Sequence, residues 1–158
     1  MKYDIPDFLK SKISRKVYLR WLDRKSAAHV KRDKARGKKA AYKEAIHKAV
    51  WKSGGRDVYT GEELAWDLIS KYNNDASEKD GRRYKAGFAL LPTVDHVHRG
   101  IEPPEFEICA WRTNDAKNDL PFEEFVSLCR RVIQHCSRGG ERCAGQTPRE
   151  QMCLTEQA

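Results

Sequence analysis

The sequence predicts an α+β protein that is mainly helical, with a basic helical arm at its N-terminus. Apolar residues recur at helical spacing over 13–52 and again over 121–136, and they alternate over 105–111 as in a strand. The length of 158 residues suits one domain with an arm. The longest apolar run, Phe88–Leu91, is far short of the ~20 residues that span a bilayer. Lysines and arginines occupy residues 10–16, where a signal peptide would be apolar, so membrane and secreted proteins are excluded.

The arm is expected to hold two helices. The first covers residues 13–36, is capped by Ser14 and is ended by Gly37. The second covers Lys38–Lys52, and Gly54 lies just beyond its end. A short third helix follows over Glu63–Tyr72, and the polar segment Asn73–Arg83 is expected to be a loop because it contains Gly81.

Two strands and two helices are expected in the rest of the chain. Phe88–Val94 is a strand in which Pro92 marks an edge or a bulge, and Glu105–Trp111 is its alternating partner across the loop 99–104. Thr113 caps a short helical turn. Asp119 caps a firmer helix, 121–136, with an apolar stripe on one face. The predicted organisation is therefore an arm over 1–53, a central domain over 54–136 and a disordered tail over 137–158.

Charge is concentrated in the arm. The whole chain has a net charge of +8, yet residues 10–52 carry 16 basic and 3 acidic side chains. Such a block is typical of a protein that binds a polyanion, because each phosphate that it neutralises releases condensed counterions. The alternative is a solvated pair of basic helices that keeps the protein soluble.

The cysteines indicate a reducing compartment. There are five, an odd number, and none forms a C-x-x-C pair, so neither a disulfide scaffold nor a zinc knuckle is expected. A cytoplasmic protein with free thiols at Cys109 and Cys129 fits this pattern best.

The residues that could hydrolyse a phosphodiester bond lie close together in the sequence, from the end of the first strand onward. His96 titrates near neutral pH and can act as a base, and Asp95 supplies the hard oxygen that Mg²⁺ or Mn²⁺ prefers. Asn114 and Asn118 are four residues apart and would share a helix face, so both are candidate metal ligands, with Asn118 the second choice. Arg112 and Lys117 are positioned to hold phosphates. His98 is expected to be a hydrogen-bonded bystander, and His29, His47 and His135 to be surface or packing residues.

Around these residues the sequence resembles the HNH endonucleases, whose ββα-metal motif binds one divalent ion. Asp95-His96 matches the Asp-His pair of that family, and Asn114 with Lys117 matches its Asn-x-x-Lys helix. The resemblance implies that Asp95 and Asn114 ligate the metal and that His96 activates water, leaving a 5′ phosphate and a 3′ hydroxyl. It covers about residues 55–135. Glu105 stands where the family has a central Asn.

A second departure concerns a structural zinc that many members of the family carry. Its four cysteine ligands would fall on Asp57, Thr60, Ala110 and Thr113, so no structural zinc is expected. Packing must then hold these segments together, and helix 121–136 and Trp111 are the expected substitutes.

The function expected from these features is metal-dependent cleavage of DNA, in preference to RNA, by a monomer or homodimer. The basic arm would dock on the phosphate backbone without reading sequence. Its candidate contacts are Arg24, Lys31, Arg32, Lys38 and Lys39. Two alternatives remain open, a non-catalytic nucleic-acid-binding protein with a degenerate motif and an interaction protein that docks on an acidic partner.

Overall fold

A computed structural model describes residues 3–35, 38–97 and 104–138. The chain divides into two compact units, Met1–Asn118 and Asp119–Ala158. The first unit is mainly helical with one two-stranded antiparallel sheet, as the α+β prediction requires. Its elements are α1 (Asp7–Lys10), α2 (Arg15–Arg32), α3 (Lys39–Ser53), the 3₁₀ helix η1 (Trp66–Leu68), α4 (Asn74–Ala86), β1 (Pro92–His96), β2 (Phe106–Ala110) and α5 (Trp111–Lys117).

The two helices predicted in the arm are α2 and α3. The Ser14 hydroxyl accepts a hydrogen bond from the Val17 amide and begins α2, as expected. The helix ends at Arg32, earlier than residue 36, and Asp33 caps it. Helix α3 ends at Gly54, which takes the left-handed conformation (φ 56°) that favours glycine at this position.

Between the arm and the sheet, two predicted elements are wrong. The helix expected over Glu63–Tyr72 is reduced to η1, because the amides of Leu64 and Ala65 donate to the carbonyls of Gly55 and Leu90. These two amides therefore donate to carbonyls outside the segment and not to carbonyls within a longer helix. The loop expected over Asn73–Arg83 is instead most of α4, which the Asn73 side chain caps by accepting from the Ala76 amide. Helical geometry is interrupted only at Gly81 (φ 53°).

The sheet is the hairpin of β1 and β2, in which Pro92 pairs with Ala110 and His96 with Phe106. The predicted first strand begins too early, since Phe88–Leu91 forms a turn. Pro92, which has no amide hydrogen to donate, opens the strand. Asp95 and His96 are the last two residues of β1, so their side chains face opposite sides of the hairpin.

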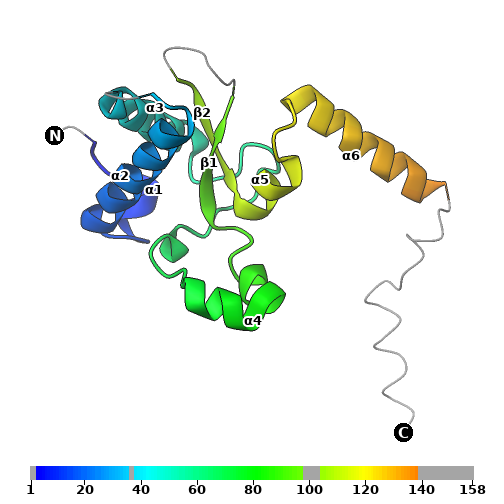
Figure 1. Cartoon of the computed structure of the whole chain (residues 1–158), viewed down its shortest axis with the longest axis horizontal. Helices are drawn as coiled ribbons and strands as arrows, with labels where there is room; N and C mark the ends of the chain where they lie inside the picture. Colours follow the sequence, from blue (N-terminus) through cyan, green and yellow to red (C-terminus); the bar gives the residue numbers. More distant parts are fainter. Residues whose placement is uncertain (1–2, 36–37, 98–103, 139–158) are drawn as a thin grey trace, which may run out of the picture. The chain divides into compact units, whose positions relative to one another are not determined.

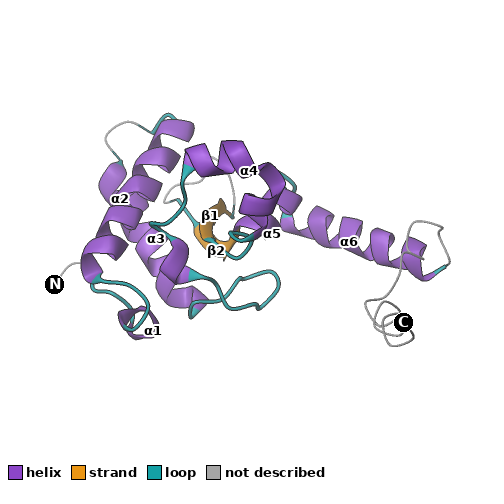
Figure 2. Ribbon diagram, turned by 90° about the horizontal axis from the view of Figure 1, so that it is seen from below, coloured by secondary structure: helices purple, strands orange, loops and turns teal. Residues whose placement is uncertain are grey.

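The hydrophobic core joins the arm to the hairpin. Helices α2 and α3 lie on one side of the two strands and α5 on the other (Figure 1), and Figure 2 shows the hairpin between α3 and α5. Trp21 of α2 meets Trp66 edge to face, with ring centroids 5.3 Å apart. One cluster contains buried residues of α2, α3, η1 and both strands, including Leu22, Ile46, Val94 and Ile108. The basic helices are therefore part of the folded body that carries the hairpin.

The second unit contains α6 (Phe122–Ser137), which corresponds to the helix predicted over 121–136. Pro121 occupies its N-cap in place of the expected Asp119. No residue of α6 is buried, and its apolar stripe is exposed at Phe122, Val132 and Ile133. The expected tail begins within α6 at Ser137, and its residues 139–158 lie outside the described residues.

Two further sequence expectations concern cysteines and membranes. Cys109 and Cys129 are free thiols, as expected, whereas Cys136 is disulfide-bonded. Over the described ranges, no helix combines the length and apolarity needed to cross a membrane.

Candidate active site

His96 is held at the end of β1 by side chains from the basic arm. Its Nε2 lies 2.7 Å from Asp33 Oδ2, and Arg32 Nη2 is hydrogen-bonded to its Nδ1. A carboxylate only accepts and a guanidinium only donates, so Nε2 carries the proton and Nδ1 the lone pair. The rings of His29 and Phe106 each lie 4.8 Å from the imidazole. Only 8% of the His96 side chain is exposed.

The electrostatics around His96 favour a neutral imidazole beside an ionised Asp33. Burial lowers the pKa of His96, and the Asp33 carboxylate opposes this effect. Burial also opposes ionisation of Asp33, but the hydrogen bonds from His96 and Tyr42 outweigh it, so the pKa of Asp33 lies below its usual value. Tyr42 donates to the same Oδ2 at 2.9 Å, which anchors the carboxylate to α3.

Sequence reasoning missed Asp33 and treated His29 as a surface or packing residue. His29 is buried, and its Nδ1 accepts from the same Arg32 nitrogen that contacts His96, at 2.7 Å. Asp33 is one of only three acidic residues in the basic segment 10–52. This rarity was the one available signal, because 63 positions separate Asp33 from His96.

Asp95 lies on the other face of the hairpin, toward α5. It is buried, and its Oδ2 accepts from the Tyr59 hydroxyl at 2.6 Å and pairs with Lys117 Nζ at 3.0 Å. Burial, followed by the hydrogen bond to Asp95, raises the pKa of Tyr59, so the phenol stays a donor. The structure thus joins Asp95 to the helix that carries Asn114, while it holds His96 among residues of α2.

The two candidate metal ligands, Asp95 and Asn114, are carried by β1 and by α5. Asn114 is half-buried and lies one turn before Lys117 on α5, so the two share a helix face. Asn118 does not share that face, because it ends the helix with φ 53° and ψ −124°. Within 3–35, 38–97 and 104–138, no three His, Cys, Asp or Glu residues converge on one point. A carboxylate oxygen is the kind of ligand that Mg²⁺ prefers, but Asp95 Oδ2 is already paired with the Lys117 ammonium.

The four positions at which the resemblance places zinc ligands come together around the Asp57 carboxylate. Its Oδ2 accepts from the Ala110 amide at 2.9 Å and from the Thr113 hydroxyl at 2.7 Å. Its Oδ1 accepts from the amides of Tyr59 at 2.8 Å and Thr60 at 3.3 Å. Asp57 is only 1% exposed. A buried carboxylate, which the sequence did not lead us to expect in this role, therefore ties the 57–60 loop to the start of α5.

The candidate phosphate-binding residues have different environments. Lys117 is 5% exposed and paired with Asp95, so it is not a surface cation, and Arg112 is paired with Glu62. Lys39 lies 3.9 Å from Asp23, and Arg24 donates to the Ile69 carbonyl at 2.9 Å. A groove of about 740 Å³ on the arm is lined by Lys31, Lys34 and Lys39 together with Ala27 and Val30.

The remaining candidates are His98 and Glu105. His98 lies outside the described residues. The side chain of Glu105 is exposed, and its carbonyl accepts from the Val97 amide at 3.1 Å, which continues the hairpin by one bond.

No protein-family model, curated protein or solved structure matches this chain.

Proposed function

We propose that this protein is a metal-dependent endonuclease of the HNH type, which hydrolyses phosphodiester bonds of DNA. The observation that carries the proposal is the His96 imidazole, whose Nε2–H is bound by Asp33 and whose Nδ1 faces the Arg32 guanidinium. A hairpin followed directly by a helix, with Asp95 and His96 at the end of its first strand, is the order that the ββα-metal motif requires.

His96 is proposed as the general base. Because Asp33 accepts the Nε2 proton, the lone pair of the ring is on Nδ1, the nitrogen available to take a proton from water. Arg32 contacts that nitrogen now, but 51% of its side chain is exposed. A phosphate bound by the guanidinium would draw Arg32 away from Nδ1, so that a water could take its place.

Asp95 and Asn114 are the residues proposed to hold the metal ion. When bound, the ion would stabilise charge on the phosphoryl group and on the leaving oxygen. The ion pair between Lys117 and Asp95 would then break, or Lys117 would share the carboxylate with the ion. The net charge of +13 over residues 10–52 supplies the docking surface for DNA, with Lys31, Lys34 and Lys39 around one groove.

The experiment is incubation of a supercoiled plasmid with the purified chain and Mg²⁺ or Mn²⁺. Nicked or linear product that EDTA suppresses is expected. His96→Ala is expected to lower the cleavage rate about 10²–10⁴-fold, the usual contribution of a general base, with DNA affinity nearly unchanged. The matched control is His135→Ala on α6, an exposed histidine to which the proposal gives no role, and it is expected to cleave at the parent rate. Equal cleavage by the parent and His96→Ala would remove His96 from the reaction.

A non-catalytic nucleic-acid-binding protein is the second candidate. It is favoured by the Lys117 ammonium on Asp95 and by the placement of Asp95 and His96 toward opposite faces of the hairpin. A gel shift of the plasmid without any cleavage, under all metals tested, would support this candidate and overturn the nuclease.

A further inference from the structure

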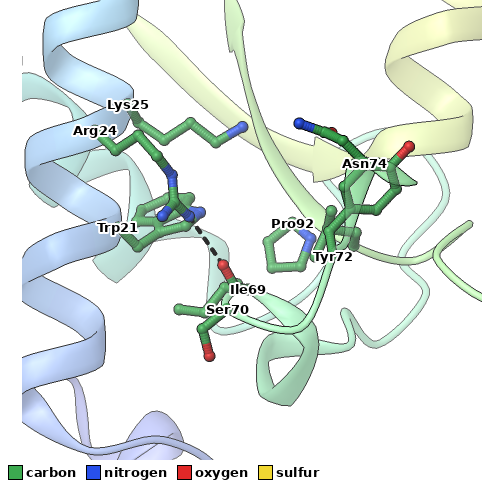
Figure 3. Close-up of a pocket in the computed structure, with 9 residues that line it drawn as sticks. Trp21, Arg24, Lys25, Ile69, Ser70, Tyr72, Asn74 and Pro92 are labelled. Carbon is green, nitrogen blue, oxygen red and sulfur yellow. Dashed lines mark hydrogen bonds between the residues drawn. The ribbon is translucent and has the colours of Figure 1, made fainter. Parts of the chain in front are cut away.

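A cavity of about 370 Å³ lies beside Pro92, the first residue of β1, whereas His96 is the last residue of that strand. It is bounded by α2, by the segment that follows η1 and by Pro92 at the start of the strand (Figure 3). Its size lies within the usual range of small-ligand sites, roughly 300–1,000 Å³. Trp21 forms an apolar wall, and the polar ends of Lys25 and Asn74 point toward the space between them (Figure 3).

Two cations line this cavity without a carboxylate partner. Arg24 Nη2 donates to the Ile69 carbonyl at 2.9 Å, and Lys25 Nζ donates to the Thr93 hydroxyl at 3.1 Å. No ion pair within the described part of the chain includes either residue, whereas nearby Lys43 lies 2.9 Å from Asp23. Two neighbouring cations without a counter-ion form a site suited to an anion.

The environment of Lys25 supports this interpretation. Burial, followed by the charge of the neighbouring Arg24, lowers the pKa of Lys25 to about 8. Its ammonium is thus held where charge is costly, and it donates to the hydroxyl of Thr93. An anion in the cavity would stabilise both cations.

We propose that this cavity binds the terminal phosphate of a nucleic-acid strand. A phosphate monoester carries a charge of about −1.5 to −2 at neutral pH, which matches two cations better than the single charge of a backbone diester. The Asn74 amide and the aromatic edge of Tyr72 lie beside the space that the attached nucleoside would occupy.

The position of the cavity deepens the proposed function, on which this step rests. Lys25 is bonded to Thr93, and His96 lies three residues farther along β1, or about 10 Å at the usual rise of a strand. Along one strand of a double helix, where successive nucleotides are 3.4 Å apart, that length corresponds to about three nucleotides. A strand end held at Lys25 would therefore place a phosphodiester a few nucleotides from its terminus near the end of β1 that carries Asp95 and His96.

The test measures binding without cleavage. Fluorescence anisotropy in EDTA compares a short single-stranded oligonucleotide that carries a terminal phosphate, at the 5′ or the 3′ end, with the same strand without it; the dye is on the other end. The phosphorylated strand is expected to bind at least about tenfold more tightly, because a single charge-assisted contact already gives about that factor. Excess inorganic phosphate is expected to reduce its affinity to that of the unphosphorylated strand.

Two variants locate the preference. Lys25→Met keeps the aliphatic stem and removes the charge, and Arg24→Gln removes the second cation; each is expected to abolish the preference for the phosphorylated end. Lys16→Gln, an exposed lysine on the same helix, is expected to weaken both strands equally and to keep the preference. Circular dichroism of each variant verifies the fold.

Equal binding of the phosphorylated and unphosphorylated strands would overturn the proposal, even if inorganic phosphate alone binds in calorimetry. A preference that survives in both Lys25→Met and Arg24→Gln would overturn it too. Because no cleavage is measured, loss of the nuclease proposal through His96→Ala would leave this result standing, and the reverse also holds.

Discussion

The two faces of the β1–β2 hairpin use acidic residues in different ways. On the α5 side, Asp57 and Asp95 are buried and accept from fixed donors of the loop, of β2 and of α5 itself. On the α2 side, Asp33 is partly exposed and binds an imidazole that also contacts a half-exposed arginine. The donors around Asp57 and Asp95 are therefore fixed by buried neighbours, whereas the half-exposed Arg32 beside Asp33 is able to change partners.

The largest effect is expected at Asp57. Asp57→Ala leaves the Thr113 hydroxyl and the Ala110 amide without acceptors in a buried place, and each unsatisfied donor costs about 1–3 kcal/mol. The free energy of unfolding in urea is expected to fall by about 3 kcal/mol. The control Asp67→Ala removes only an exposed pair with Lys71 and is expected to stay within about 0.5 kcal/mol. If both variants unfold at the same urea concentration, Asp57 does not join the loop to α5.

Asp33 is expected to influence activity more than stability. Asp33→Asn keeps the shape but can present its amide to Nε2, so the tautomer of His96 is no longer specified. The turnover rate on plasmid DNA is expected to fall about 10–100-fold, as for other orienting partners of a histidine, with KM nearly unchanged. A matched control is Asp23→Asn on α2, which weakens the ion pairs of Asp23 with Lys39 and Lys43 of α3. An equal loss in both variants would show that the acidic residues of the arm act only through charge.

His29 is expected to make the α2 face sensitive to acid. Burial, followed by the charge of Arg32, lowers the pKa of His29 to about 3, while in the unfolded chain the value is about 6.5. Below pH 6.5 the unfolded chain therefore binds a proton that the folded chain excludes, and stability falls as the pH falls toward 3. The expected loss from this residue is about 2 kcal/mol between pH 6.5 and 5.

The check is urea unfolding at both pH values for the parent and for His29→Gln, whose amide oxygen can still accept from Arg32. The free energy of unfolding of the parent should fall relative to that of His29→Gln as the pH falls. A constant difference would mean that His29 does not titrate on unfolding.

The smallest effect is expected on the arm surface. Lys31 is exposed and lines the basic groove, so Lys31→Gln is expected to weaken DNA binding for every sequence and to reduce the slope of log affinity against log salt by about 1. Lys71→Gln, which removes an exposed lysine already paired with Asp67, is the control and should keep the slope. An unchanged slope in Lys31→Gln would place the DNA elsewhere.

Local patterns predicted much of the secondary structure. Ser14 and Gly54 mark the start of α2 and the end of α3 because capping needs only neighbouring backbone groups. The alternation over 105–111 identified β2 because successive side chains of a strand face opposite sides of the sheet. The predictions for 63–72 and 73–83 were wrong. In the first segment, tertiary hydrogen bonds from the amides of Leu64 and Ala65 competed with helix formation. In the second, the helix is polar and therefore has no apolar stripe in the sequence.

By itself, the sequence determined which residues are consecutive at the end of β1 and which helix follows β2, so the proximity of Asp95 to the Asn114 helix could be anticipated. Only the tertiary structure decided the partners of each side chain. Asp33, Arg32 and His29 meet His96 because α2 packs along the hairpin, across a sequence separation of more than sixty residues. Burial then determines protonation and accessibility, and both depend on packed neighbours that no local pattern of residues specifies.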